Sequence, residues 1–124
     1  MAVWNSKNGY CVTFESSAYQ NLGFKYVKDL GPGEVVEITN SNLTVLNEPY
    51  KEMKICSFLW SYYGYPTSRY EGQNVEVMRY KNGKIMAKNE MEAGTMPELD
   101  YVCGIPDSGT PHALGYAAKS KIGF

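Results

Sequence analysis

The hydrophobic and polar positions in the first part of the chain alternate over short stretches. Tyr10, Val12 and Phe14 are separated by more polar residues, a period of two that predicts a half-buried strand. Val36 and Ile38 share one side of a further short stretch, and the polar run 40–42 reverses the chain into a third apolar stretch at 43–46. The pattern therefore predicts a β-hairpin over 36–46.

A short helix is expected between the first strand and this hairpin. Ser17 and Gln20 have the spacing of a capping box, and Gly23 follows Leu22 where a short helix would close. The run Leu30-Gly31-Pro32-Gly33 is a turn signal, so it should separate the helix from the hairpin.

The polar run 47–52 contains Pro49 and predicts a connection between two parts of the chain. We therefore place a domain boundary at residue 50, which gives regions 1–50 and 51–124. The run 55–63 is apolar and aromatic without helical spacing, and this favours a buried strand that ends at Gly64.

The stretch 74–91 supports two interpretations. Val75, Met78, Ile85 and Met86 fit one face of a helix, whereas the run 81–84, Lys-Asn-Gly-Lys, is also a good hairpin turn. The local pattern leaves both open.

The last part of the chain predicts a strand, a loop and a helix. Residues 101–105 are a short apolar strand, residues 106–111 form a polar loop, and the following run places Leu114, Ala117 and Ala118 where they could face a sheet. Together with the hairpin, this unit predicts a mixed α/β fold.

The loop before this last helix has the composition of an anion site. A strand that ends in a turn and opens a helix directs backbone N–H groups and the positive end of the helix toward one point. Gly109 allows a ligand to approach closely, and Ser108 and Thr110 add hydroxyls that can reach an oxyanion or a divalent cation. The same residues also suit an ordinary turn and an N-cap, so a purely structural loop is the alternative.

Composition and charge exclude several classes of function. Lysine and arginine number 12 against 13 acidic residues, so no broad basic surface is available for nucleic acid or an anionic membrane. No run approaches the about 18 apolar residues that suggest a bilayer span, and the first residues lack a secretory signal, so a cytoplasmic location is expected. The cysteines, Cys11, Cys56 and Cys103, are few and widely spaced, which disfavours disulfides or a self-contained zinc site.

Three segments of the chain resemble glutamine phosphoribosylpyrophosphate amidotransferases. The run 104–117, Gly-Ile-Pro-Asp-Ser-Gly-Thr-Pro-His-Ala-Leu-Gly-Tyr-Ala, resembles the family's pyrophosphate-binding loop and the helix after it. The run 56–68, with Gly72 and Arg79 beyond it, resembles the aromatic entrance of the phosphoribosyltransferase domain, and residues 15–34 resemble the end of the glutaminase domain. The order and approximate spacing of all three agree with the family.

The resemblance implies a section of an enzyme that transfers ammonia from glutamine to phosphoribosylpyrophosphate, giving phosphoribosylamine for purine synthesis. Region 1–50 would be an antiparallel β section of an N-terminal-nucleophile glutaminase domain, and region 51–124 would open a Rossmann-like phosphoribosyltransferase sheet, with a helix favoured for 74–91. The pyrophosphate would bind Asp107, Ser108, Gly109 and Thr110, and Ser108 would reach a magnesium ion. The implied partners are phosphoribosylpyrophosphate and the remainder of the enzyme or a homo-oligomer.

Some family groups are absent or changed. Residue 2 is alanine where the glutaminase needs an exposed cysteine, so glutamine hydrolysis by these residues alone is not expected. Cys56 matches a ligand of the iron–sulfur cluster found in some members, but three cysteines cannot supply four thiolates, so a free thiol is the expected state here. The family's glutamate, arginine and aspartate are replaced by Leu59, Tyr65 and Thr67, which removes charges that could couple the two domains.

Overall fold

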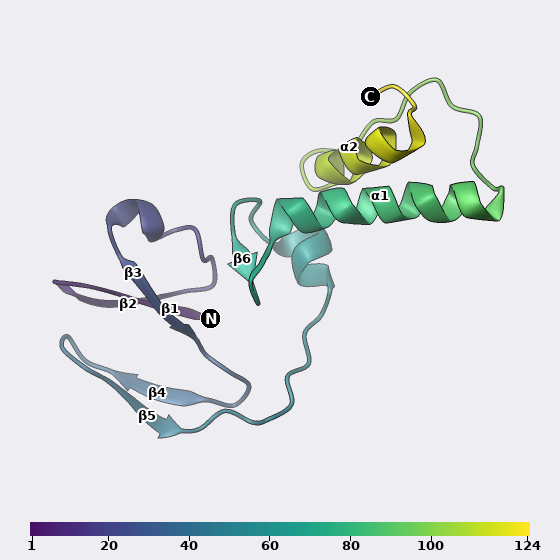
Figure 1. The fold of residues 1–124 in the computed structure, drawn as a ribbon. Coiled ribbons are helices and arrows are strands. Elements are labelled where there is room, and N and C mark those ends of the chain that lie inside the picture. Colours follow the sequence, from purple (N-terminus) through teal and green to yellow (C-terminus); the bar gives the residue numbers. More distant parts are fainter. The chain divides into compact units, whose positions relative to one another are not determined.

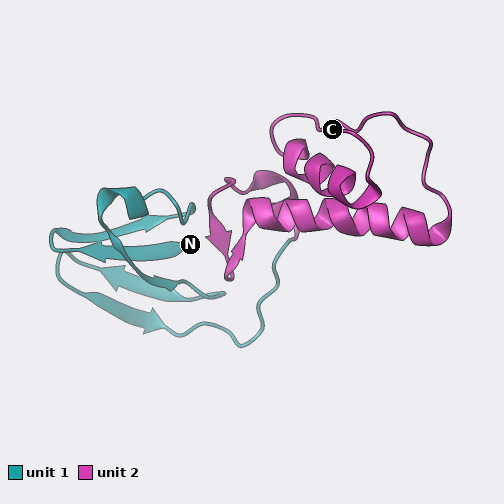
Figure 2. Ribbon diagram, turned by 45° about the horizontal axis from the view of Figure 1, so that its top comes forward, with its two compact units in different colours: residues 1–56 teal, residues 57–124 magenta.

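The computed structural model describes residues 1–124 as two compact units, residues 1–56 and residues 57–124 (Figure 2). The first unit contains only strands and one short 3-10 turn, and the second contains both long helices. A mixed α/β fold with small antiparallel sheets is confirmed. The assignment of regions 1–50 and 51–124 to a glutaminase-like and a phosphoribosyltransferase-like domain stays a prediction.

The first unit is built on an antiparallel sheet of three strands in the order β2-β1-β3 (Figure 1). Its strands are β1 (Ala2–Ser6), β2 (Gly9–Thr13) and β3 (Lys25–Asp29). Ala2, Val3 and Trp4 are buried because β1 is the central strand and has a neighbour on each side. The predicted strand near residue 12 is therefore confirmed as β2, whereas β1 and β3 had no clear signal in the sequence.

The predicted short helix is a single 3-10 turn, η1 (Gln20–Leu22). Tyr19 occupies the N-cap position and makes no side-chain capping bond, so the capping box from Ser17 was wrong. Gly23 closes the turn with φ of 77°, as predicted, because glycine adopts this left-handed conformation without a steric penalty.

The predicted hairpin is confirmed as the antiparallel pair β4 (Val35–Ile38) and β5 (Leu43–Asn47). Thr39 and Asn42 close its turn, since the Thr39 N–H donates to the Asn42 carbonyl over 2.9 Å and the Asn42 N–H donates to the Thr39 hydroxyl over 3.1 Å. The turn therefore lies where the polar run 40–42 placed it.

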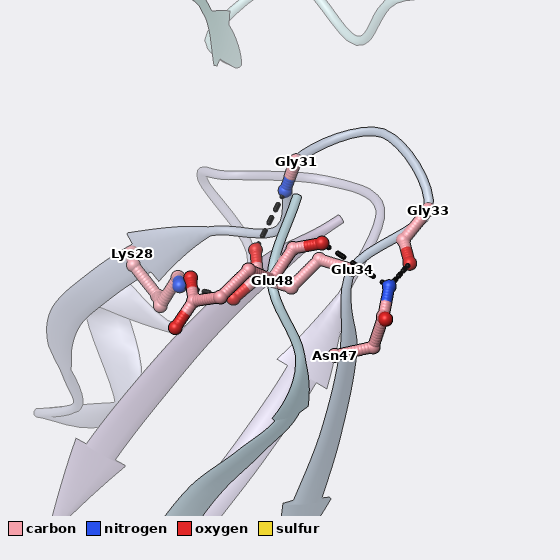
Figure 3. Close-up of polar contacts among 6 residues, drawn as sticks. All are labelled: Lys28, Gly31, Gly33, Glu34, Asn47 and Glu48. Atoms are coloured by element: carbon pink, nitrogen blue, oxygen red, sulfur yellow. Dashed lines mark hydrogen bonds and ion pairs between the residues drawn. The ribbon is translucent and has the colours of Figure 1, made fainter. Parts of the chain in front are cut away.

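Glu34 links the end of β3 to the start of β4 (Figure 3). Its side chain is 1% exposed, accepts a hydrogen bond from the Gly31 N–H over 2.8 Å and forms an ion pair with Lys28. Asn47, at the end of β5, makes a further link to the turn before β4, because its side-chain amide donates a hydrogen bond to the Gly33 carbonyl over 2.9 Å. The hydrogen bond from Lys28, and then that from Gly31, hold the pKa of Glu34 below its ordinary value.

The second unit is dominated by α1 (Val75–Ala93) and α2 (Gly109–Ser120). The alternative for 74–91 is thereby settled in favour of the helix, with the Asn74 side chain accepting a 2.9 Å hydrogen bond from the Val77 N–H as its N-cap. Two short antiparallel strands, β6 (Arg69–Tyr70) and β7 (Gln73–Asn74), precede α1. No helix of the structure combines the length and the apolar character needed to cross a membrane.

The buried strand predicted for 55–63 was wrong, because residues 59–63 form a π-helix, η2 (Leu59–Tyr63). Arg79 of α1 explains the difference. Arg79 is 2% exposed, and its guanidinium donates to the carbonyls of Trp60, Tyr62 and Gly64 over 2.8 to 2.9 Å. The Arg79 side chain thus supplies the hydrogen-bond donors that these carbonyls would find in a neighbouring strand if the segment were part of a sheet.

The two long helices pack against each other through glycine. A Cβ atom on Gly83 of α1 would lie 1.8 Å from the His112 carbonyl oxygen, and one on Gly115 of α2 would lie 1.9 Å from the Tyr80 carbonyl oxygen. Gly115, a buried residue of α2, thus faces α1. Of the residues predicted to face a sheet, Ala117 is buried, whereas Leu114 and Ala118 are exposed.

The strand predicted for 101–105 forms only one parallel bridge, between Tyr101 and Gly123. Its residues nevertheless alternate between exposed and half-buried positions, as those of a strand with one covered face would. Because α2 lies between the two bridged segments in the sequence, this is a β-α-β connection reduced to a single bridge. The expectation that region 51–124 opens a Rossmann-like sheet stays a prediction, because this segment makes only one parallel bridge within residues 1–124.

Candidate functional site

The predicted anion loop lies at the N-terminal end of α2, as the sequence indicated. Ser108 is the N-cap residue, and Gly109 and Thr110 are the first helical residues. The peptide between Pro106 and Asp107 is cis. A helix of 12 residues carries a partial positive charge at this end, which favours a bound anion.

The backbone amides of the loop divide into two pairs. The Gly109 N–H donates to the Ile105 carbonyl over 3.0 Å, and the Thr110 N–H donates to the Asp107 carbonyl over 3.3 Å. The amides of Asp107 and Ser108 have no protein partner. Two of the four amides expected to face an anion are thus used within the loop, and two are available.

The side chains of the loop add oxygen atoms that have no hydrogen-bond or ion-pair partner in the protein. Ser108 makes no capping bond, and no hydrogen bond or ion pair engages Asp107 or Thr110 through its side chain. Ser108 and Thr110 are half-buried and Asp107 is exposed. The loop therefore offers two hydroxyls and one carboxylate beside the two available amides.

Gly104 is a residue that the sequence analysis did not single out for this site. A Cβ atom there would lie 2.6 Å from the carbonyl group of Gly109, so only glycine allows the strand segment to approach the start of α2 this closely. A Cβ atom on Gly109 would meet ordinary contacts at 3.6 to 3.7 Å, mainly with Gly104. The steric requirement expected at Gly109 is therefore found five residues earlier in the chain.

A mainly apolar pocket of about 310 Å³ lies beside the loop in the second unit. His112 borders it, and the His112 Nε2 atom lies 3.3 Å from the Ser61 carbonyl oxygen. The pocket is lined by Met86, Val102, Cys103, Gly104, Ile105, Gly109, His112, Ala113 and Tyr116. A polyanion would not enter such a pocket, because burying charge against apolar groups is unfavourable. The polar loop is therefore the candidate anion site, and the pocket is suited to apolar groups.

The described residues contain no group of three or more His, Cys, Asp or Glu side chains that could hold a metal ion. Cys56 and Cys103 are exposed free thiols, and Cys11 is a half-buried free thiol whose pKa is raised by burial. A metal ion held by Ser108 would therefore need its other ligands from water and substrate, which is the usual arrangement for Mg²⁺ at a phosphate site.

The chain is similar in sequence to curated amidophosphoribosyltransferases. It is 35% identical to that of Drosophila melanogaster over 121 residues, which cover 94% of this chain and 21% of the relative. It is 30% identical to that of Archaeoglobus fulgidus over 125 residues, which cover 100% of this chain and 26% of the relative. The chain thus spans only about a fifth to a quarter of these relatives, and no family model matches it.

Solved structures agree with the sequence relatives. A structure described as the allosteric regulatory enzyme of purine biosynthesis matches with a TM-score of 0.82 and 28% identity, covering 98% of this chain and 25% of the other. Glutamine phosphoribosylpyrophosphate amidotransferase from B. subtilis, in complex with ADP and GMP, also matches with a TM-score of 0.82. The chain is therefore homologous along nearly its whole length to amidophosphoribosyltransferases, which confirms the family resemblance that its motifs predicted.

Proposed function

We propose that this chain supplies the pyrophosphate-binding loop of an amidophosphoribosyltransferase, which transfers glutamine-derived ammonia to phosphoribosylpyrophosphate and gives phosphoribosylamine. One observation supports this most directly. The amides of Asp107 and Ser108 and the hydroxyl of Ser108 have no protein partner and lie together at the N-terminal end of α2. The same residues belong to the segment that resembles the family's pyrophosphate loop.

The chemistry of the leaving group accounts for this choice of residues. Pyrophosphate is a polyanion, so amide dipoles and the end of a helix stabilise the negative charge that develops as it departs. Thr110 contributes a further hydroxyl, and Gly109 presents no side chain to the anion. These groups bind and orient the leaving pyrophosphate without any covalent role.

Magnesium fits this loop on chemical grounds. The Asp107 carboxylate has no cationic partner and would repel a polyanion beside it, so a divalent cation between them would be favourable. The Ser108 hydroxyl is a hard oxygen ligand of the kind that Mg²⁺ accepts. When bound, the ion would neutralise charge on the departing pyrophosphate.

The rest of the reaction requires groups outside these 124 residues. The glutamine-hydrolysing nucleophile and the ribose-phosphate loop of the family would come from the remainder of the enzyme or from another subunit, working in the cytoplasm. An iron–sulfur cluster would need at least one further thiolate, because the chain has three cysteines.

The second candidate function is a phosphate-binding or purely structural domain without catalytic activity. The internal hydrogen bonds of the Gly109 and Thr110 amides favour it, because a turn closed in this way is already satisfied without a ligand. The two candidates differ in whether the loop binds phosphoribosylpyrophosphate at all.

Thermal unfolding with and without ligand separates the candidates. At a hundred times its dissociation constant, phosphoribosylpyrophosphate with Mg²⁺ should add about 2.7 kcal/mol of stability. Ser108→Ala should abolish most of this shift, whereas Ser41→Ala, which removes an exposed hydroxyl from the turn between β4 and β5, should leave it unchanged. A folded chain with no shift under any condition supports the structural candidate and contradicts the proposal.

A further inference from the structure

His112 is the fourth residue of α2 and follows closely on the anion loop, residues 107–110. The residue is half-buried, and its Nε2 atom lies 3.3 Å from the carbonyl oxygen of Ser61 in η2. A carbonyl oxygen accepts hydrogen bonds and never donates them, so Nε2 carries a proton and is the donor. The bond joins residues 51 positions apart in the sequence and links α2 directly to η2.

The Ser61 carbonyl lies between two carbonyls that another side chain binds. Arg79 of α1 donates to the Trp60 carbonyl over 2.8 Å and to the Tyr62 carbonyl over 2.9 Å. Three successive carbonyls of η2 therefore receive hydrogen bonds from side chains of the two long helices. α1 holds η2 through Arg79, and α2 holds it through His112.

The backbone of His112 is fixed by a different neighbour. A Cβ atom on Gly83 of α1 would lie 1.8 Å from the His112 carbonyl oxygen, so this carbonyl packs directly against the α1 backbone. α2 and η2 each pack against α1, and the His112 side chain adds a direct link between them. The start of α2 is therefore positioned by two elements.

The position of the start of α2 determines where the loop amides point. The Gly109 and Thr110 amides donate hydrogen bonds within the loop. The amides of Asp107 and Ser108, which are available to an anion, directly precede the helix. An amide dipole stabilises an anion when it is aimed at the charge, and donors that are already fixed need no reorganisation when the ligand binds. A side chain that fixes the start of α2 thus affects anion binding without touching the anion.

We propose that His112 is a positioning residue for the anion loop. Its hydrogen bond to the Ser61 carbonyl joins the start of α2 to η2 and holds the amides of Asp107 and Ser108 in the orientation that binds pyrophosphate. This inference rests on the proposed function for the identity of the ligand, but the effect of His112 on the loop is measured without any ligand.

Tyr116 provides the comparison with a purely structural role. Its hydroxyl donates to the Glu90 carboxylate of α1, so it also joins α2 to a neighbouring element. This bond lies four residues beyond His112 and one helical turn further from the loop. Tyr116→Phe keeps the ring and loses the bond, so it should lower the stability of the second unit without changing the loop.

The test compares His112→Met with His112→Gln. The two new side chains have similar length and shape, but only glutamine keeps an N–H donor. In the ligand-free chain, amide hydrogen exchange at Gly109 and Thr110 should be about fivefold faster in His112→Met, the effect of losing one hydrogen bond. His112→Gln should restore these rates to within about twofold of the unchanged chain, and Tyr116→Phe should leave them unchanged.

Titration with Mg²⁺ and pyrophosphate then measures the effect on binding. His112→Met should raise the dissociation constant about fivefold, because the loop amides are no longer held in place before the ligand arrives. His112→Gln should bind within about twofold of the unchanged chain, and so should Tyr116→Phe. Nitrogen-15 spectra of the neutral imidazole in the unchanged chain should show the proton on Nε2.

Equal exchange rates in folded His112→Met and His112→Gln would overturn the proposal, as would a neutral imidazole with its proton on Nδ1. Loop exchange accelerated as much by Tyr116→Phe as by His112→Met would show a general stabilising role and would also overturn it. So would equal dissociation constants for the two His112 variants in a chain that binds pyrophosphate. If the exchange rates respond as expected but the unchanged chain does not bind pyrophosphate, the proposed function is contradicted and the positioning of the loop by His112 is supported.

Discussion

Replacing Gly83 with alanine should destabilise the second unit sharply. The new Cβ atom would lie 1.8 Å from the His112 carbonyl oxygen, so α2 must withdraw by about 1.6 Å to reach the 3.4 Å at which ordinary contact begins. Overpacking of this kind costs about 1–3 kcal/mol, and the upper end applies because the obstructing atoms belong to a helix backbone. Alanine recovers about 1 kcal/mol through its higher helix propensity. The expected net loss is about 2 kcal/mol.

Urea denaturation followed by circular dichroism at the helical band measures this loss, because both α-helices lie in the second unit. In a domain of this size the same loss should lower the melting temperature by about 10 °C. Asn89→Ala is the control, since Asn89 is an exposed residue of the same helix and its replacement should stabilise by a few tenths of a kcal/mol, about the propensity difference. If Gly83→Ala is as stable as Asn89→Ala, the close approach of the two helices is refuted.

Three further predictions concern other groups. Arg79→Met should destabilise the second unit by about 3 kcal/mol or more, because three backbone carbonyls lose a buried hydrogen-bond donor. Urea denaturation measures this loss of stability, and a loss below about 1 kcal/mol would contradict the prediction. The folded pKa of Glu34 is depressed, so the stability that its carboxylate contributes should be present above the ordinary pKa of 4.5 and disappear as the pH falls through the lower folded pKa. Glu34→Gln should flatten this acid dependence of the melting temperature, and an unchanged profile would count against the ion pair between Lys28 and Glu34. Iodoacetamide at pH 8 should modify Cys56 and Cys103 before Cys11, because the Cys11 thiol is half-buried and has a raised pKa. Mass spectrometry of the digested protein shows the order of modification, and early modification of Cys11 would contradict the prediction.

Local signals predicted the elements whose structure is set by neighbouring residues. The β4–β5 hairpin follows from the polar run at 40–42, and Gly23 closes η1 because a left-handed residue is needed there. The prediction of a helix at α1 depended on the family resemblance, because the run 81–84, which contains Gly83, has the composition of a hairpin turn when it is considered alone. Gly83 serves instead to let α2 approach, and that reason lies about thirty residues further along the chain.

Elements held by distant residues could not be predicted. The aromatic run 55–63 has the composition of a strand, but Arg79, 15 to 19 residues beyond the carbonyls that it binds, stabilises a π-helix. The segment 101–105 has the alternation of a strand but only one bridge, because a strand also needs neighbours. In both cases the missing information was the identity of the hydrogen-bond partner.

The position of the candidate site could be predicted, but its detailed groups could not. The composition of 107–110 placed a polar loop at the start of a helix, and α2 begins there. Which amides remain available depends on the path of the turn, which engages Gly109 and Thr110 and leaves Asp107 and Ser108. The requirement for Gly104 likewise arises from the approach of two backbone segments and has no signature in the loop itself.

The most direct test of the pyrophosphate-loop proposal is an amide chemical-shift titration of the ¹⁵N-labelled chain with Mg²⁺ and pyrophosphate. The account predicts saturable shifts that are largest at the amides of Asp107 and Ser108 and that are lost in Ser108→Ala. Equal small shifts at lysines across the surface, or no change at these two amides at saturating pyrophosphate, would contradict it.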